Sequence, residues 1–373
     1  MANTNMTLLY PDFWALAFDE FDKGQYPLKN LVNRQYESLL ARFGDVVNVP
    51  IAESMTADNY TPGETLTASN LTQVTKQVTL NQSKRKTLEF NGTELTMSPY
   101  DLIQSYAVPA IESLMEAVET GIYVEMLKGK YFSDGMTTFN EDTVIDAGTL
   151  LSGRKIAIAN RKLVLAPGDS GSLKKTDPYQ FVNQSGERDV MIDGMITKRM
   201  GFDFYESNGI SIYTPFDLVG AINNVAGYAI GDTTIIVNGF NDDANPIRPG
   251  DIFKITGDTT PYTVVSTTTT TSDTTGITFY PPLVAAAANT TAVTVTPTRS
   301  VLAFVPNALA FAARPYAEIP AGAGVISRVM DMDGMPIRIS VWHSGNLGLK
   351  VQYDVLYGHT LVDERRVQRI IID

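Results

Sequence analysis

The chain has 373 residues, 44% of them hydrophobic and 19% charged, which is typical of a globular protein with two or three domains and excludes a disordered chain. It contains no cysteine and only two histidines, which excludes disulfide frameworks and thiolate nucleophiles and leaves little scope for histidine chemistry. The formal charge of −12 argues against DNA binding by charge neutralisation, and no apolar run approaches the roughly 20 residues of a membrane span.

Two amphipathic segments open the chain. The first, residues 10–18, carries Trp14 among apolar neighbours. It either packs in the core or docks as an arm on a neighbouring molecule, and the sequence favours the core. The second, Leu28–Phe43, has apolar residues along one side and is followed by Gly44. This pattern predicts a helix that ends at the glycine.

Residues 46–97 are predicted to form an extended excursion around a polar stretch, 52–70. Short strands are predicted at 46–51, 77–80 and 87–90. The triplet Lys84-Arg85-Lys86 is expected at a hairpin tip, where it either blunts edge-to-edge pairing or contacts an acidic neighbour. Because a lone hairpin is marginal in water, the excursion must lie on its own domain or on another subunit.

Ser98–Lys130 is predicted to be one long helix of roughly 45–50 Å. A capping sequence, Ser98-Pro99-Tyr100-Asp101, opens it, and apolar residues recur at helical spacing as far as Met126. Pro109 removes one backbone hydrogen bond, so a kink or short break is expected near it. Glutamates fill the polar positions Glu112, Glu116, Glu119 and Glu125.

The segment 131–226 is predicted to be mixed α and β. A helix is expected over Leu150–Leu163, a buried strand over 163–165, and a second strand over Gly201–Gly209. The motif Gly168-Asp169-Ser170-Gly171-Ser172 is close to the surround of a serine-protease nucleophile. Both histidines lie far downstream of it, so we predict a solvent-exposed loop instead.

Composition changes over residues 227–298, which include five consecutive threonines at 267–271. Strands are plausible at 233–238, 251–256, 262–266, 276–280 and 292–296. Their spacing, with glycine and proline turns between them, suggests a small β-barrel or sandwich inserted in the main chain that folds nearly autonomously. A helical pattern is read at Asn307–Arg314, and further strands at 336–342, 350–358 and 367–372.

Other candidate sites are weak. Asp331-Met332-Asp333-Gly334 resembles the start of a calcium loop but lacks the later ligands, so a turn is predicted. His343 and His359 flank strands and turns and are each expected to be polar surface residues. We therefore predict no catalytic residue, no metal site, no cofactor and no enzymatic activity.

Three pieces of the chain carry a resemblance to a known family. They are Arg161–Pro167 with Gly201–Tyr205, Arg248–Ile255 with Phe279–Leu283, and Ile337–Trp342 followed by Val351–Gly358. In this order the chain resembles the major capsid proteins of tailed phages with the HK97 fold, specifically the branch typified by the coat protein of phage P22. The inserted segment is shorter than is typical of that branch.

The resemblance implies an α+β, HK97-like capsid fold. The implied divisions are an N-terminal arm (1–45), an extended loop (46–97), a spine helix of the peripheral domain (98–130), a mixed axial and peripheral domain (131–226), a β-barrel-like insertion domain (227–298), an axial-domain return (299–335) and C-terminal peripheral strands (336–373). Cross-linking through a loop lysine is not expected, because the closer resemblance is to the branch that does not cross-link.

The implied function is a coat protein that self-assembles into hexamers and pentamers of an icosahedral shell around double-stranded DNA, without sequence-specific binding. Scaffolding and portal proteins would be partners, with assembly in the bacterial host cytoplasm and a final location in the virion. Candidate inter-subunit contacts are Lys84, Arg85, Lys86, Trp14, Glu112, Glu116 and Glu119. Two rivals stay open: a tail or adhesin protein with a glycan-binding β domain, and a hydrolase using Ser170.

Overall fold

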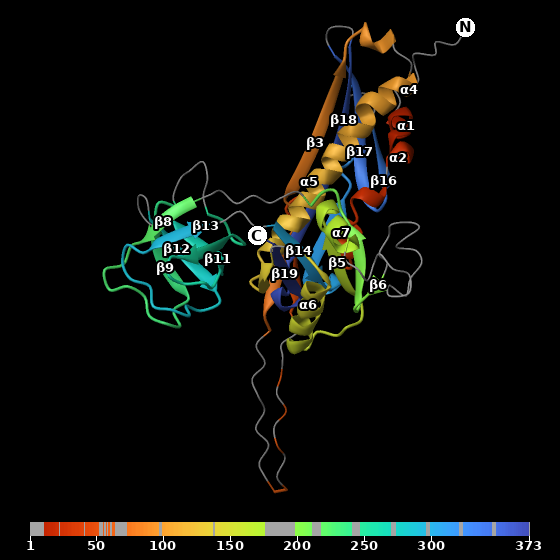
Figure 1. Ribbon diagram of the computed structural model, residues 1–373. Coiled ribbons are helices and arrows are strands. Elements are labelled where there is room, and N and C mark those ends of the chain that lie inside the picture. The colour runs from red at the N-terminus through yellow and green to blue at the C-terminus, as the bar shows by residue number, and fades with distance from the viewer. Residues whose placement is uncertain are drawn as a thin grey trace, which may run out of the picture.

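The computed structural model describes residues 11–21, 23–40, 42–51, 73–96, 99–136, 139–175, 198–210, 218–240, 247–269, 274–295, 299–320, 324–344 and 348–372, with isolated positions between 52 and 72. A long helix and two sheets form an elongated body, and a β-barrel lies beside it (Figure 1). None of the described helices is long and apolar enough to cross a membrane.

The predicted long helix is confirmed, with its break at the expected place. It consists of α4 (Pro99–Leu102), a π-helical turn η5 (Ile103–Ala107) and α5 (Val108–Leu127). The backbone N–H of Val108 donates to the carbonyl of Ile103, five residues back. Pro109 follows directly, and a proline ring crowds the carbonyl four residues before it. The wider π turn is one of the known ways in which a helix absorbs such a conflict.

The helix α5 lies across a sheet of five strands (Figure 1). Their order is β15 (Leu309–Arg314), β18 (Gly348–Leu361), β17 (Met335–Ser344) and β16 (Val325–Met332), and β3 (Gln82–Phe90) also pairs with β18. Ile111, Leu114 and Val118 of the helix pack on Val351, Tyr353 and Val355 of β18 in one apolar core, all of them buried. The predicted turn Asp331–Gly334 is confirmed between β16 and β17.

Two expectations about this sheet are wrong. Lys84–Lys86 lies in the middle of β3, opposite Tyr353–Val355 of β18, and not at a hairpin tip. The excursion therefore has a cover within its own chain over Gln82–Phe90. Asn307–Arg314 is not a helix, because the short turn η6 (Pro306–Ala308) leads into β15, whose backbone pairs with residues 356–361. An alanine-rich run suits a helix locally, but ladder pairing inside a core decides its conformation here.

A second sheet has six strands: β4 (Phe132–Met136), β19 (Val367–Ile372), β14 (Arg299–Phe304), β5 (Arg161–Leu165), β7 (Phe202–Glu206) and β6 (Lys198–Arg199).

The predicted helix at Leu150–Leu163 is wrong. The helix is α6 (Glu141–Gly153), which begins where the Asn140 side chain accepts the Thr143 N–H at 3.1 Å. The left-handed backbone of Lys155 and Asn160 keeps 154–160 out of the helix.

The predicted strands of the barrel are present, and the structure adds a sixth. The closed order is β10 (Ile252–Ile255), β11 (Tyr262–Thr269), β12 (Thr274–Tyr280), β9 (Thr234–Asn238), β8 (Leu218–Ile222) and β13 (Ala292–Val295). The missed strand β8 pairs with β9 and β13 and so closes the barrel. It contains Gly220, where a Cβ would lie 2.4 Å from the Asn238 carbonyl oxygen.

The barrel contacts the body at the end of the long helix. The rings of Tyr131 and Tyr280 meet edge to face at 5.4 Å, and the Lys130 ammonium lies 6.0 Å from the Tyr280 ring. Gly250 has φ +100°, and a Cβ there would come within 2.7 Å of the Leu127 carbonyl oxygen. The turn that carries Gly250 therefore packs directly on the helix terminus.

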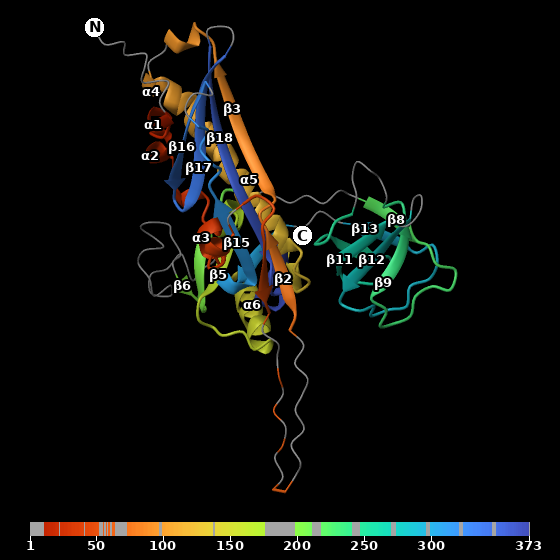
Figure 2. The same cartoon turned by 180° about the vertical axis from the view of Figure 1, so that it is seen from behind.

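The N-terminal region consists of short pieces. They are α1 (Pro11–Trp14), α2 (Ala17–Glu20), η2 (Lys23–Gln25), α3 (Leu28–Leu31) and η3 (Glu37–Leu39), followed by β1 (Val46–Pro50), which pairs with β2 (Thr75–Thr79). The predicted helix Leu28–Phe43 is wrong. The Asn33 backbone N–H donates to the carbonyls of Pro306 and Leu309, so this segment lies beside β15 (Figure 2).

Candidate functional site

The basic triplet is exposed on β3. Lys84, Arg85 and Lys86 stand opposite Val355, Asp354 and Tyr353 of β18. Alternate residues of a strand point to opposite faces, so Lys84 and Lys86 share one face and Arg85 has the other. Phe90, an even-numbered residue of the same strand, is buried in the core beneath α5, which places Lys84 and Lys86 on the helix side of the strand.

A groove of about 690 Å³ runs between α5, β3 and β18. Lys84, Glu116 and Glu125 all line it, together with Lys128 and His359. The structure therefore brings Lys84 and Glu116 to the same groove of one subunit. A contact between Glu116 and the basic triplet of a neighbour would compete with this arrangement.

His359 is not the surface residue that we expected. Its side chain is only 12% exposed, and its ring stacks on that of Tyr357 with centroids 5.8 Å apart. Nδ1 lies 3.9 Å from Oε2 of Glu125, and burial lowers the pKa of the imidazole below its ordinary value. His343 is exposed at the end of β17, as predicted.

The three candidate glutamates occupy different environments. Glu116 is exposed and Glu112 half-buried, whereas Glu119 is 1% exposed. Oε1 of Glu119 accepts hydrogen bonds from the Leu28 backbone N–H at 3.0 Å and from Ser207 Oγ at 2.7 Å. Oε2 is buried without a hydrogen-bond partner, and burial raises the pKa of Glu119 to about 7. Glu119 therefore holds the N-terminal region to α5 and does not face a neighbour.

Trp14 belongs to the core of its own subunit. It is 0% exposed and stacks on Phe90 of β3 at 5.3 Å, and its carbonyl accepts a hydrogen bond from the Tyr353 hydroxyl at 3.3 Å. Such burial is the favourable outcome for a large aromatic side chain. It removes Trp14 from the surface that a neighbouring subunit could touch.

The serine motif forms a helix, so the predicted loop is wrong. Pro167–Lys174 is α7, which begins at the proline, and Asp169 and Ser170 are buried in its first turn. Ser170 is 4% exposed, and Asp169 Oδ1 lies 2.5 Å from Nη2 of Arg299. Within the described residues, histidine, cysteine, aspartate and glutamate form no group of three or more that could hold a metal ion.

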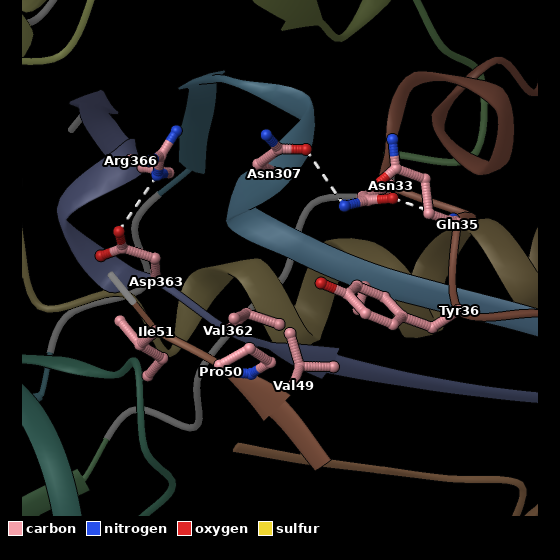
Figure 3. Close-up of a pocket in the computed structure, with 11 residues that line it drawn as sticks. Asn33, Gln35, Tyr36, Val49, Pro50, Ile51, Asn307, Val362, Asp363 and Arg366 are labelled. Atoms are coloured by element: carbon pink, nitrogen blue, oxygen red, sulfur yellow. Dashed lines mark hydrogen bonds and ion pairs between the residues drawn. The ribbon is translucent and has the colours of Figure 1, made fainter. Parts of the chain in front are cut away.

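A further pocket, absent from the sequence predictions, lies at the base of the β1–β2 hairpin. Figure 3 shows Asn33, Asn307 and Arg366 along one side of it, and Val49, Pro50 and Val362 along the other. Its volume is about 160 Å³. We call it the root pocket. Its charged residues lie in and beside the turn η7 (Glu364–Arg366), and the sequence signal that could have found them is the charged run Asp363–Arg366.

No family model and no curated protein sequence matches the chain. A solved structure from Mycobacterium phage Che8 is similar with a TM-score of 0.54 and 13% identity, over 91% of this chain and 89% of that one. The capsid of the cyanophage P-SCSP1u is similar with a TM-score of 0.46 and 11% identity, over 90% of this chain and 85% of that one. A virus-like particle from Pyrococcus furiosus is similar with a TM-score of 0.44 and 11% identity, over 97% of this chain and 98% of that one. The structural neighbours thus include phage capsid proteins, and the likeness to the Che8 structure establishes a shared fold across nearly the whole chain.

Proposed function

We propose that this chain is the major capsid protein of a tailed bacteriophage. The observation that carries the proposal is the fold likeness to the Mycobacterium phage Che8 structure, which spans about nine tenths of both chains. In this proposal copies form hexamers and pentamers of an icosahedral shell around double-stranded DNA. Scaffolding and portal proteins are its partners, and the assembled chain resides in the virion.

The order of elements supports a P22-like arrangement. A closed barrel is inserted between β7 and β14 of the second sheet, where the resemblance to that branch implies an insertion domain. We assign 218–295 to the insertion domain, which starts nine residues earlier than the sequence suggested because β8 belongs to the barrel. The long helix and the β15–β18 sheet then form the peripheral part, and the six-stranded sheet belongs to the axial part. This changes the divisions that the resemblance implied, because β15 and β16, within 299–335, pair with the peripheral strands, and β19, within 336–373, pairs with the axial ones.

The net charge of the chain is compatible with the role of a capsid wall. The chain carries 41 acidic and 29 basic residues, so a wall built from it adheres weakly to packed DNA. The exposed triplet Lys84-Arg85-Lys86 on β3 is then free to meet acidic groups of a neighbouring subunit. Exposed ion pairs are individually weak, at about 0–1 kcal/mol, but repeat at every contact of a shell.

Expression of the full chain, alone and with its scaffolding protein, tests the proposal by electron microscopy and sedimentation. Closed shells or capsomers are expected, and a compact monomer under every assembly condition would refute it. The double variant Lys84→Glu/Lys86→Glu should lower the yield of shells. The matched control Lys84→Gln/Lys86→Gln, which removes both charges without reversing them, should lower it less because it adds no like-charge repulsion.

A further inference from the structure

His359 is held between the long helix and the sheet, in the lining of the groove between α5, β3 and β18. A Cβ at Gly121 of α5 would come within 3.2 Å of its Nε2, so a larger residue at 121 would crowd the ring. The glycine lets the helix pass close over the imidazole. The ring also stacks on Tyr357 of the same strand, with centroids 5.8 Å apart. Contacts from two elements therefore fix its position.

The imidazole has one nitrogen that makes no hydrogen bond. Nδ1 is buried and has no hydrogen-bond partner among the residues that the structure describes, whereas a buried polar atom is normally bonded. Oε2 of Glu125 lies 3.9 Å from Nδ1, beyond the ordinary hydrogen-bond range. Closing this gap needs a movement of about 1 Å. The groove, of about 690 Å³, leaves space for it.

The carboxylate of Glu125 is already bonded to other groups. Its Oε2 lies 2.6 Å from Nζ of Lys128, and its Oε1 accepts the Leu361 backbone N–H at 3.3 Å. The Lys128 side chain is 44% exposed, so water can replace Glu125 as its partner at little cost. Glu125 thus has one cationic partner in Lys128 and gains a second when His359 is protonated.

The charged groups around His359 balance while the imidazole is neutral. They come from the three elements that line the groove: Glu116, Glu125 and Lys128 of α5, and Lys84 of β3, with the hydroxyl of Tyr357 on β18. Burial raises the pKa of Tyr357 to about 12, so its hydroxyl stays neutral. The neighbouring strand β15 places the uncharged Phe311 opposite His359. Two carboxylates face two ammonium groups, and protonation of His359 adds a positive charge without a carboxylate of its own.

We propose that His359 is an acid-operated switch between α5 and β18. While the imidazole is neutral, Glu125 pairs with Lys128. On protonation, Oε2 of Glu125 turns to Nδ1 of His359 and Lys128 is released into water. The new charge lies beneath α5, so the end of the helix packs less tightly on β18. The switch rests on the fold alone and does not depend on the proposed function.

The direction of the pH effect follows from burial, which lowers the pKa of the His359 imidazole below its ordinary value of 6.5. The folded state therefore favours the neutral ring. The resulting stability is fully present above pH 6.5 and is lost as the pH falls through the folded-state pKa.

The exchange of partners is tested by NMR on the unassembled, full-length subunit with labelled histidine rings. The chain has only two histidines, and His359→Gln identifies the signals of His359. Lys128→Gln removes a repelling charge and frees Glu125, so the titration midpoint of His359 should rise. Glu125→Gln removes the attracting carboxylate, so the midpoint should fall.

Glu116→Gln is the matched control, because Glu116 is a second carboxylate of the same groove that does not pair with Lys128. It should shift the midpoint of His359 less than either of the other two variants. Equal midpoints in all the proteins, a fall in Lys128→Gln, or a ring that never becomes protonated overturns the exchange of partners.

The looser packing is tested by hydrogen exchange at Leu361, whose N–H donates to Glu125. The ratio of its exchange rate in the wild type to that in His359→Gln should rise at least tenfold from pH 8 to pH 5. Glu119 titrates in both proteins and cancels in the ratio. Lys128→Gln alters an exposed side chain and keeps the core, and its Leu361 exchange should accelerate at a higher pH than in the wild type. An unchanged ratio, or acceleration at the same pH in Lys128→Gln, overturns the switch.

Discussion

The carboxyl group of Glu119 is buried between α5, the start of α3 and the turn after β7. Burial raises its pKa in the folded state from an ordinary value of 4.5 to about 7. A carboxyl group with a raised folded-state pKa contributes stability that is fully present below pH 4.5 and is lost as the pH rises through 7. With 1.36 kcal/mol per pKa unit, the loss between pH 5 and pH 8 is about 2–3 kcal/mol.

Glu119→Gln removes this titration while keeping a carbonyl oxygen for the bonds from Leu28 and Ser207. Urea unfolding of the soluble subunit at several pH values gives the free energy of unfolding. The wild type should lose about 2–3 kcal/mol more than Glu119→Gln between pH 5 and pH 8. Other groups, including His359, titrate in both proteins and cancel in the difference.

Glu116→Gln is the matched control, because Glu116 lies on the same helix and is exposed. It should keep the wild-type pH dependence. If Glu119→Gln and the wild type lose stability in parallel over this range, then Glu119 is ionised in the folded state at an ordinary pKa, and the reasoning from its burial is refuted.

Three further predictions concern packing and charge. Trp14→Ala should cost about 3–5 kcal/mol in urea unfolding because it empties a buried site, and a loss under 1 kcal/mol would contradict core placement. Arg338→Ala leaves the buried carboxylate of Asp354 without its 2.7 Å partner and should cost about 3 kcal/mol, measured the same way; a neutral effect would count against a buried pair. Gly220→Ala forces a Cβ against the Asn238 carbonyl, so the barrel amides should lose hydrogen-exchange protection, and unchanged protection would refute the packing of β8.

The sequence alone predicts the elements whose local pattern agrees with their tertiary structure. The strands β17, β18 and β19 and five barrel strands alternate or end at turn residues, and they are found at nearly the predicted positions. The break in the long helix followed from Pro109 alone. These features depend on chemistry within a few residues, which a single sequence displays.

The wrong predictions concern segments whose structure is decided by contacts with residues distant in the sequence. Asn307–Arg314 has the composition of a helix, yet it forms β15 because β18 offers a ladder inside the core. Leu28–Phe43 is interrupted at Asn33 by hydrogen bonds from a segment more than 270 residues away. Similarly, only the packing of α5 against β18 shows that His359 is buried.

Contacts with residues distant in the sequence also decide the surroundings of the candidate contact residues, so the sequence alone did not predict those surroundings. Lys84–Lys86 was recognised as exposed and basic, but its pairing with β18 could not be read from its own residues. Glu119 occupies a polar position of the helical pattern and is buried because Leu28 and Ser207 supply donors to its carboxyl group. The root pocket draws residues from four separate segments, so no local motif marks it apart from the charged run Asp363–Arg366.

We propose that copies of this chain build a capsid shell. Cryo-electron microscopy of particles assembled from the purified chain, with scaffolding protein present, tests this proposal. The proposal predicts closed shells in which pentamers and hexamers of this fold meet, with β3 and the β1–β2 hairpin at contacts between subunits. Reconstructions and sedimentation that show only isolated compact monomers, whatever the assembly conditions, would contradict it.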